Sequence, residues 1–251
     1  FASFYLKLGE RIAAKYADEV IVLSKSVQDY FRNTYGRETV LIENAVVPVE
    51  YTPCSLLSER FGLERGGYVL FLARIVPEKG LHYLIEAFLN CSTDKKLVIA
   101  GEIPDTEYGG KIRKLAAGTD RIIFTGFAQG NVMAALYSNC ALYVLPSEIE
   151  GLALTLLEAM SAGARCMTSD IPENTDVLGD FGYTFRSGDV GSLERQLLLA
   201  LSEPEENGRM DEQKRYIMEK YNYSAVVEKT EAVYRKAVQH EYGSGNERKG
   251  R

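Results

Sequence analysis

The sequence predicts an α/β protein built on a doubly wound parallel sheet with helices on both faces. Apolar runs of strand length alternate with segments of helical period along most of the chain. The runs are almost continuously apolar, which is typical of strands that are covered on both sides. With 251 residues, 46% of them hydrophobic and 25% charged, the chain is long enough and apolar enough to bury such a core.

Residues 1–45 contain the first part of this alternation. The elements expected there are a helix over residues 2–16, a strand over 19–23, a helix that ends at Gly36, and a strand over 39–44. Ser24 or Ser26 provides the N-cap of the second helix, and Gly36 provides its stop. Residues 46–66 contain prolines and show no clear period, so we expect a linker between two domains there.

Residues 67–222 show the most regular alternation and are expected to form the larger domain. Six strands are expected, at residues 68–73, 96–101, 121–126, 141–146, 164–169 and 183–189. Helices are expected at residues 80–89, 107–117, 131–139, 191–202 and 210–222, with one more that begins near Gly151. Ligands of such sheets bind beyond the carboxyl ends of the strands, so we expect the site in the loops that follow the strands.

The end of the chain is expected to be a helix over residues 223–240, followed by a disordered tail over 241–251. The helix has apolar residues along one side and therefore needs a surface to lie on. The tail is low in apolar residues. The chain opens at Phe1, without a methionine, in a segment that already has helical character, so we expect it to be the C-terminal part of a longer protein.

Composition excludes several classes of function. A net charge of -6 and a pI near 5.2 argue against nucleic acid as a partner, because phosphate backbones require a basic face. The four cysteines form no CxxC pair and only two histidines are present, so we expect no metal site. The longest apolar runs are too short to cross a bilayer, which favours a cytoplasmic protein.

The loop after the first strand of the larger domain carries two cations, Arg74 and Lys79. The usual phosphate-binding glycine motifs are absent, so a phosphate ligand would have to be held by side-chain cations and helix N-termini. Arginine can bind a diphosphate in a bidentate way and lysine acts as a point charge. The alternative is that both are solvated charges on a surface turn.

Two glutamates, Glu150 and Glu158, stand on an otherwise apolar segment. If its helix begins near Gly151, the carboxylates lie about 12 Å apart along the axis, which is about the span from the ribose to the hexose of a nucleotide sugar. The free N–H groups of the first turn would face a diphosphate between them. The alternative makes Glu150 an N-cap acid and Glu158 a solvated residue.

Five segments of the chain carry motifs of one known family. They read "FLARIVPEKGLHYLIEAF", "KLVIAG", "IIFTGF", "LYVLPSEIEGLALTLLEAMSAG" and "SDIPENTDVLGDFGYTFRSGD". Together they resemble the retaining GT-B glycosyltransferases of the group-one class, family four. The resemblance covers residues 17–235, and the combination of Glu, seven residues, Glu with an upstream R-x-x-x-x-K-G is specific.

The resemblance implies a donor-binding Rossmann-like domain and roles for single residues. Arg74 and Lys79 match the pair that grips the donor diphosphate, Glu150 matches the acid against the hydroxyls of the donor sugar, and Glu158 matches the acid that accepts hydrogen bonds from the ribose. Further donor contacts are implied for Gly151, Leu152, Leu154, Thr155, Gly126 and Phe127. The family often has Phe-Gly or a proline where this chain has Leu152-Ala153-Leu154, which leaves the sugar open.

The mechanism expected from these charges is electrostatic. Breaking the bond between sugar and phosphate leaves negative charge on the diphosphate, and the two cations and the helix N-terminus hold that charge more strongly as it grows. Neither a metal ion nor another cofactor is then required. By resemblance, the anomeric configuration is retained.

In this family the donor binds to the C-terminal half and the acceptor to the N-terminal half. Residues 1–45 are then the last units of the acceptor half, and the acceptor pocket lies upstream of Phe1. We expect this chain alone to bind donor weakly or not at all, and not to turn over. Contact with the inner face of a membrane would be made through the missing half.

The resemblance favours a UDP-hexose over GDP-mannose as donor, and a saccharide or lipid-linked acceptor in surface polysaccharide or glycolipid synthesis. Two alternatives stay open. One is a nucleotide-sugar-binding module without catalysis, and the other is a nucleotide-sugar epimerase, which would accept donor without acceptor.

Overall fold

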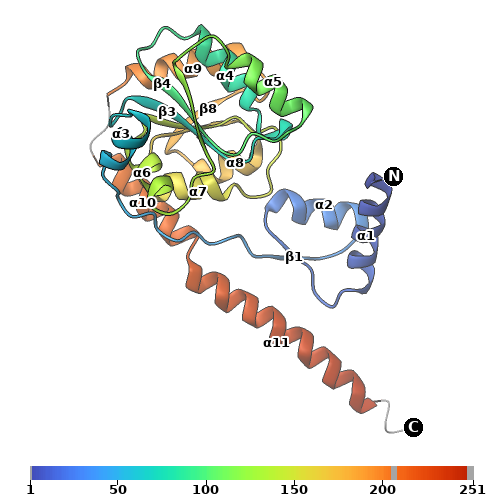
Figure 1. Ribbon diagram of the computed structural model, residues 1–251. Helices are drawn as coiled ribbons and strands as arrows, with labels where there is room; N and C mark the ends of the chain where they lie inside the picture. Colours follow the sequence, from blue (N-terminus) through green and yellow to red (C-terminus); the bar gives the residue numbers. More distant parts are fainter. Residues whose placement is uncertain (1, 205–207, 248–251) are drawn as a thin grey trace. The chain divides into compact units, whose positions relative to one another are not determined.

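The computed structural model describes residues 2–204 and 208–247, with side chains described for residues 5–204 and 208–239 (Figure 1). The chain divides into two compact units. Residues 46–220 form the larger unit, and residues 1–45 together with 221–251 form the smaller one. Each unit is considered by itself.

The larger unit is built on a parallel sheet of six strands, as the sequence predicts. The strands are β3 (Tyr68–Leu72), β4 (Lys96–Ala100), β5 (Ile122–Gly126), β6 (Leu142–Leu145), β7 (Cys166–Ser169) and β8 (Gly182–Phe185). Their order across the sheet is β5-β4-β3-β6-β7-β8. The order reverses between β3 and β6, and such a switch point opens a crevice at the carboxyl ends of the strands.

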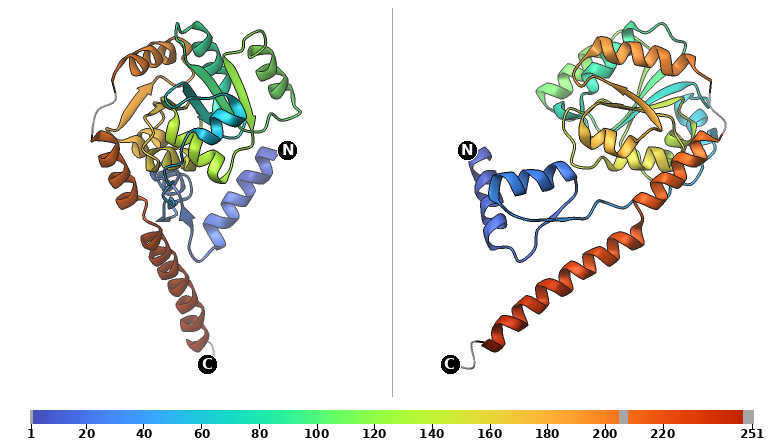
Figure 2. Two further views of the ribbon diagram at one scale, coloured as in Figure 1. Left: turned by 60° about the vertical axis from the view of Figure 1, so that its left-hand side comes forward. Right: turned by 180° about the vertical axis from the view of Figure 1, so that it is seen from behind.

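Helices cover both faces of this sheet (Figure 2). They are α3 (Ser55–Phe61), α4 (Leu81–Asn90), α5 (Glu107–Leu115), α6 (Gly130–Asn139), α7 (Leu154–Ser161), α8 (Pro172–Leu178), α9 (Val190–Ser202) and α10 (Arg209–Lys220). Helix α4 packs against α5 and α9, and α7 packs against α6, α8 and α10. The predicted doubly wound architecture is therefore confirmed.

The core lies between these layers and follows from the apolar strand runs. All five residues of β3 are buried, and so are all four residues of both β6 and β7. Strands β3 and β4 pair in register from Tyr68 with Lys96 to Leu72 with Ala100. Both faces of the central strands are covered. The parts of the sheet that remain accessible are therefore the loops at the ends of its strands.

Residues 46–66 are not a simple linker, in contrast to the expectation. They belong to the larger unit, contain α3, and bury the side chains of Val46, Leu57 and Leu63. Helix α8 was not predicted either. Both helices have seven residues, about two turns, and two turns are too short to establish a helical period in the sequence.

The smaller unit contains α1 (Ala2–Tyr16), β1 (Ile21–Val22), α2 (Lys25–Tyr35), β2 (Val40–Leu41) and α11 (Tyr223–Glu247). Strands β1 and β2 pair in parallel and are shorter than predicted. The Ser24 hydroxyl caps α2 by accepting a hydrogen bond from the Val27 N–H. Gly36 ends the same helix in the left-handed region at φ 60°, so this cap and stop are as predicted.

Helix α11 runs further than the sequence suggests. It continues through residues 241–247, part of the predicted tail, because extending an existing helix adds a hydrogen bond for each residue without a new nucleus. Residues 248–251 lie outside the described part of the chain. An ion pair of 2.5 Å between Lys236 and Glu19 joins α11 to the segment before β1. Across the described ranges, 2–204 and 208–247, neither α11 nor another helix is both long and apolar enough to span a membrane.

The four cysteines and His82 contribute to the packing of the chain. Cys91 and Cys166 are buried, Cys54 and Cys140 are partly buried, and none of the four forms a disulfide. His82 is half-buried on α4, where its Nδ1 lies 3.1 Å from the Tyr108 hydroxyl. Burial lowers the pKa of His82, which favours the neutral ring. His82 is therefore a structural side chain with a hydrogen-bond partner. The side chain of His240 lies outside the described residues.

Candidate functional site

The loop after β3 is shaped by a glycine. A short 3-10 helix, η1 (Pro77–Lys79), ends at Gly80, which has φ +65° and leads into α4. A Cβ added to Gly80 would lie 2.0 Å from the carbonyl oxygen of Pro146, the residue that follows β6. Only glycine lets the backbone pass so close to the end of β6. The close approach brings Lys79 beside the loop between β6 and α7.

Lys79 and Glu150 form an ion pair between these two loops. The Lys79 Nζ lies 2.5 Å from the Glu150 Oε1, and the side chains are 14% and 5% exposed, respectively. The Ser147 hydroxyl donates a second hydrogen bond of 2.7 Å to the same oxygen. The Glu148 N–H also donates to the Glu78 carbonyl oxygen at 2.9 Å. The first predicted acid and the second predicted cation are therefore direct partners.

Helix α7 begins at Leu154, not near Gly151 as expected. Its N-cap is Ala153, which has extended backbone geometry and forms no side-chain cap. Glu150 is not an N-cap acid, because its carboxylate is turned toward Lys79 and Ser147. The amides of Leu156 and Leu157 donate to the Ala153 carbonyl oxygen and form the first hydrogen bonds of the helix. The amides of Leu154 and Thr155, which precede them, have no acceptor within the helix.

Glu158 lies in the second turn of α7, and a side chain of α6 donates a hydrogen bond to its carboxylate. The Tyr137 hydroxyl, at the end of α6, donates a hydrogen bond of 3.1 Å to the Glu158 Oε2. Burial raises the pKa of Glu158, and the Tyr137 hydrogen bond opposes that shift. Glu158 is therefore not a plain solvated flank residue.

A cleft of about 410 Å³ opens at the carboxyl ends of β3 and β4, next to the switch point. The exposed side chain of Arg74 lines one wall, and Thr155 from the first turn of α7 lines another. Phe127, which follows β5 and is 74% exposed, borders it as well. The remaining lining residues are Leu72, Ala73, Ile75, Val76, Ala100, Gly101, Glu102, Pro104 and Ala128.

The predicted site residues thus fall on two adjoining places. Arg74, Thr155 and Phe127 line the cleft, with Gly126 at the end of β5 directly before Phe127. Lys79 and Glu150 form the ion pair beside it. The other predicted contacts, Gly151, Leu152 and Leu154, belong to the connection between β6 and α7, or to its first helical residue.

Sequence reasoning missed three polar side chains that contact the predicted residues: Ser147 contacts Glu150, Tyr137 contacts Glu158, and Tyr143 contacts Thr155 from beneath α7. Ser147 is buried and directly follows the apolar run that contains β6. Its position, as a polar residue directly after a strand, is the signal in the sequence that could have been used. Both tyrosines lie in apolar segments and pass for ordinary core residues. The Tyr143 hydroxyl donates to the Thr155 Oγ1 at 2.9 Å.

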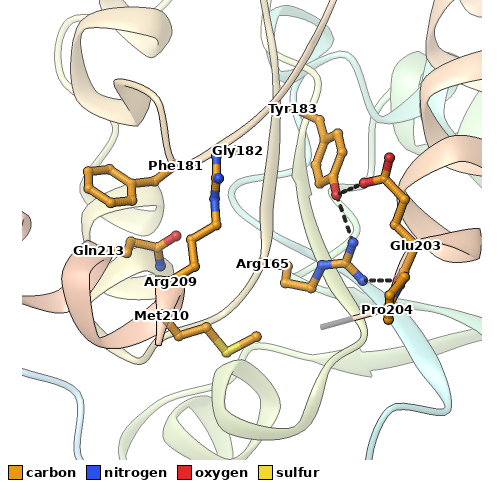
Figure 3. Close-up of a pocket in the computed structure, with 9 residues that line it drawn as sticks. All are labelled: Arg165, Phe181, Gly182, Tyr183, Glu203, Pro204, Arg209, Met210 and Gln213. Carbon is orange, nitrogen blue, oxygen red and sulfur yellow. Dashed lines mark hydrogen bonds between the residues drawn. The ribbon is translucent and has the colours of Figure 1, made fainter. Parts of the chain in front are cut away.

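Figure 3 shows a second pocket, of about 260 Å³, and the residues that line it. It lies at the amino-terminal ends of β7 and β8, because its lining includes Arg165, directly before β7, and Gly182, the first residue of β8. Arg165 precedes β7, and it donates hydrogen bonds to the Tyr183 hydroxyl at 2.8 Å and to the Glu203 carbonyl oxygen at 3.2 Å. The Tyr183 hydroxyl donates to the Glu203 Oε2 at 2.6 Å. These polar groups satisfy one another, and the pocket is remote from the loops that carry Arg74 and Glu150.

Comparison with known proteins identifies similar chains. Residues 58–217 match the profile of the family described as glycosyl transferases group 1. The chain is 30% identical over 220 residues to the serotype-specific mannosyltransferase WbdA of Escherichia coli, covering 81% of this chain and 26% of that protein. It is 31% identical over 189 residues to the alpha-D-kanosaminyltransferase of Streptomyces kanamyceticus, covering 71% and 48%, respectively.

The fold is also that of solved structures. The structure of Anabaena Alr3699/HepE in complex with UDP and glucose matches with a TM-score of 0.80 at 20% identity, covering 95% of this chain and 68% of that chain. This likeness is one of fold. The chain spans between about a quarter and a half of the two curated relatives named above.

Proposed function

The chain belongs to the group 1 glycosyl transferases, and on that premise we propose that its cleft binds a nucleotide-diphosphate sugar. In the full protein the hexosyl group is transferred, with retention of the anomeric configuration, to a saccharide or lipid-linked acceptor. The observation that carries the proposal is the meeting of Arg74, the Lys79–Glu150 pair and the start of α7 at one edge of the sheet.

The charges at this edge suit a diphosphate. Arg74 is an exposed guanidinium in the lining of the cleft, and Thr155, which also lines it, lies in the first turn of α7. The partial positive charge of the helix N-terminus and its free amides attract an anion placed in the cleft. Lys79 adds a second cation beside the cleft, and its charge is balanced by Glu150 while no donor is bound.

The same groups account for catalysis. As the bond between the sugar and the diphosphate breaks, negative charge grows on the departing diphosphate, and fixed cations bind the transition state more strongly than the ground state. We propose that these cations make a metal ion unnecessary. Loss of Arg74 is expected to raise the barrier by about 2–4 kcal/mol, by analogy with the loss of one oxyanion donor.

Glu150 is proposed to hold the donor sugar. Its Oε1 is occupied by Lys79 and Ser147, whereas its Oε2 has no hydrogen-bond partner among the described side chains. This second oxygen is free to accept hydrogen bonds from sugar hydroxyls. Glu158 is proposed to accept hydrogen bonds from the ribose in the same way.

We favour a UDP-hexose over GDP-mannose as the donor. The structure of Anabaena Alr3699/HepE contains UDP and glucose, whereas the similar Escherichia coli protein is named a mannosyltransferase. We place the protein in the cytoplasm, or at the inner membrane face where its acceptor is lipid-linked, in surface polysaccharide or glycolipid synthesis.

The test is a thermal-shift and calorimetric panel of UDP, GDP and ADP sugars. A ligand that binds only the folded chain raises its apparent melting temperature. Arg74→Ala should weaken binding of the preferred nucleotide sugar by at least tenfold. Arg113→Ala, which removes another exposed arginine, on α5 and outside the cleft, should leave it unchanged.

Two outcomes would contradict the proposal. The sequence alone suggested weak or absent donor binding by this chain; because the residues that line the cleft all lie within residues 46–220, we propose instead that the chain binds donor. One contradicting outcome is therefore that no nucleotide sugar binds, and the other is that Arg74→Ala and Arg113→Ala bind equally well. Incubation with donor alone separates an epimerase, which would change the sugar without an acceptor. Turnover by the 251-residue chain is a separate question, since binding to the cleft does not require the acceptor.

A further inference from the structure

Beneath α7 lies a pair of buried tyrosines that the proposed function does not yet use. Tyr137 is 1% exposed and Tyr143 is fully buried. Their rings meet edge to face, with centroids 5.7 Å apart. Each hydroxyl donates to a different polar side chain of α7, Tyr137 to Glu158 and Tyr143 to Thr155.

Tyr137 fixes one oxygen of a carboxylate and leaves the other open. Its hydroxyl lies 3.1 Å from the Glu158 Oε2. Over residues 5–204 and 208–239, the Glu158 Oε1 has no hydrogen-bond partner. A carboxylate anchored through one oxygen loses torsional freedom, so its second oxygen is held in one orientation. Burial keeps the pKa of Tyr137 well above its usual range, so its hydroxyl remains a donor.

We propose that Tyr137 is a positioning residue, which orients Glu158 so that its free oxygen accepts a hydrogen bond from the ribose of the bound nucleotide. This inference rests on the proposed function, because it assumes that the ribose lies against Glu158. Tyr137 does not touch the ligand. Its effect is therefore confined to the ability of the site to distinguish a ribose that carries its hydroxyls from one that lacks them.

The experiment measures affinities for UDP and for 2′,3′-dideoxyuridine diphosphate by titration calorimetry. If the panel above identifies another base, the corresponding pair of nucleotides is used. The wild-type chain should prefer the ribonucleotide by about tenfold, the worth of one hydrogen bond to a charged group. In Tyr137→Phe the preference should fall to about threefold or less, with the affinity for the dideoxynucleotide unchanged.

Tyr143→Phe is the matched control. It removes a hydroxyl from the adjoining buried ring, but that hydroxyl bonds to the Thr155 Oγ1 and, at 3.4 Å, to the Leu72 carbonyl oxygen, and not to Glu158. The preference for ribose should therefore stay at the wild-type value. Combining Tyr137→Phe with Glu158→Gln should change the preference no further than Glu158→Gln does alone, because both act on the same contact.

Several results would overturn the inference. Tyr137→Phe could keep the full preference, or Tyr143→Phe could lose as much of it, which would indicate a general loosening of the layer under α7. Melting temperatures of the free variants show whether both remain folded. If the wild-type chain binds neither nucleotide, the proposed function fails and this inference fails with it.

Discussion

The ion pair between Lys79 and Glu150 provides the sharpest prediction about stability. The two side chains are 14% and 5% exposed, so solvent screens their interaction little. Lys79→Met removes the cation with nearly the same side-chain length. It leaves a carboxylate that is almost completely buried, with Ser147 as its one remaining side-chain donor within residues 5–204 and 208–239.

The expected cost can be worked out from this geometry. Breaking a buried pair by removing one partner costs roughly 3–5 kcal/mol, and the remaining Ser147 hydrogen bond places this case at the lower end, at about 3 kcal/mol. For a unit of this size that corresponds to a melting temperature lower by roughly 6–12 °C. Glu150→Gln should cost less, about 1 kcal/mol, because the amide oxygen can still accept and a lysine can extend toward water.

The assay is urea unfolding of the free chain, followed by circular dichroism because the sequence contains no tryptophan. Since the chain forms two units, the transition that moves should be that of residues 46–220. The double variant Lys79→Met/Glu150→Gln should be more stable than the sum of the single effects predicts, by about 2 kcal/mol.

Arg186→Met is the control for this experiment. It breaks the exposed ion pair with Asp189, in which the arginine is 78% exposed, and should change stability by less than about 0.5 kcal/mol. The reasoning is refuted if Lys79→Met costs no more than this control, or if the effects of the two single variants simply add.

Four further predictions concern single residues. Nucleotide affinity should fall as the pH drops through the raised pKa of Glu158, because protonation removes the negative charge of the accepting carboxylate. The fall should occur at a higher pH than for an ordinary glutamate. Calorimetry across the weakly acid range should show no such fall in Glu158→Gln. Gly110→Ala should stabilise α5 by about 0.5–1 kcal/mol, since its Cβ meets nothing. Gly109→Ala should instead destabilise the chain by about 2–3 kcal/mol in the same urea assay, because its Cβ would lie 2.0 Å from the Pro104 carbonyl oxygen. Gly80→Ala should cost about 3–5 kcal/mol, which thermal melting would detect, because its left-handed backbone and a 2.0 Å approach to a carbonyl oxygen both oppose a side chain.

The sheet could be predicted because its signal is local. Each of the six strands is a short apolar run bounded by polar or glycine-rich residues. The structure places β3 to β7 within the predicted ranges, and β8 begins one residue before its predicted range. Ser24 and Gly36 bound α2 for the same reason, because capping is decided by neighbouring residues. The short helices α3 and α8 escaped because two turns carry too little periodicity.

The site was only partly predictable because its contacts are long-range. Lys79 and Glu150 are 71 residues apart in sequence. Their residue types suggested two separate roles, whereas the fold makes them partners. The start of α7 was misplaced for a related reason: the Glu150 side chain is drawn to Lys79 and Ser147 instead of capping a helix. A sequence pattern identifies tyrosines as core residues, and it does not show which acceptor a buried hydroxyl finds.

The most direct test of the central claim is a crystal structure of the chain with the nucleotide diphosphate that binds most tightly in the panel. We predict that the diphosphate lies in the cleft at the carboxyl ends of β3 and β4, within hydrogen-bond distance of the Arg74 guanidinium and of the first amides of α7. Clear density for the nucleotide elsewhere, such as in the pocket lined by Arg165 and Tyr183 at the other edge of the sheet, with the cleft empty, would contradict the account.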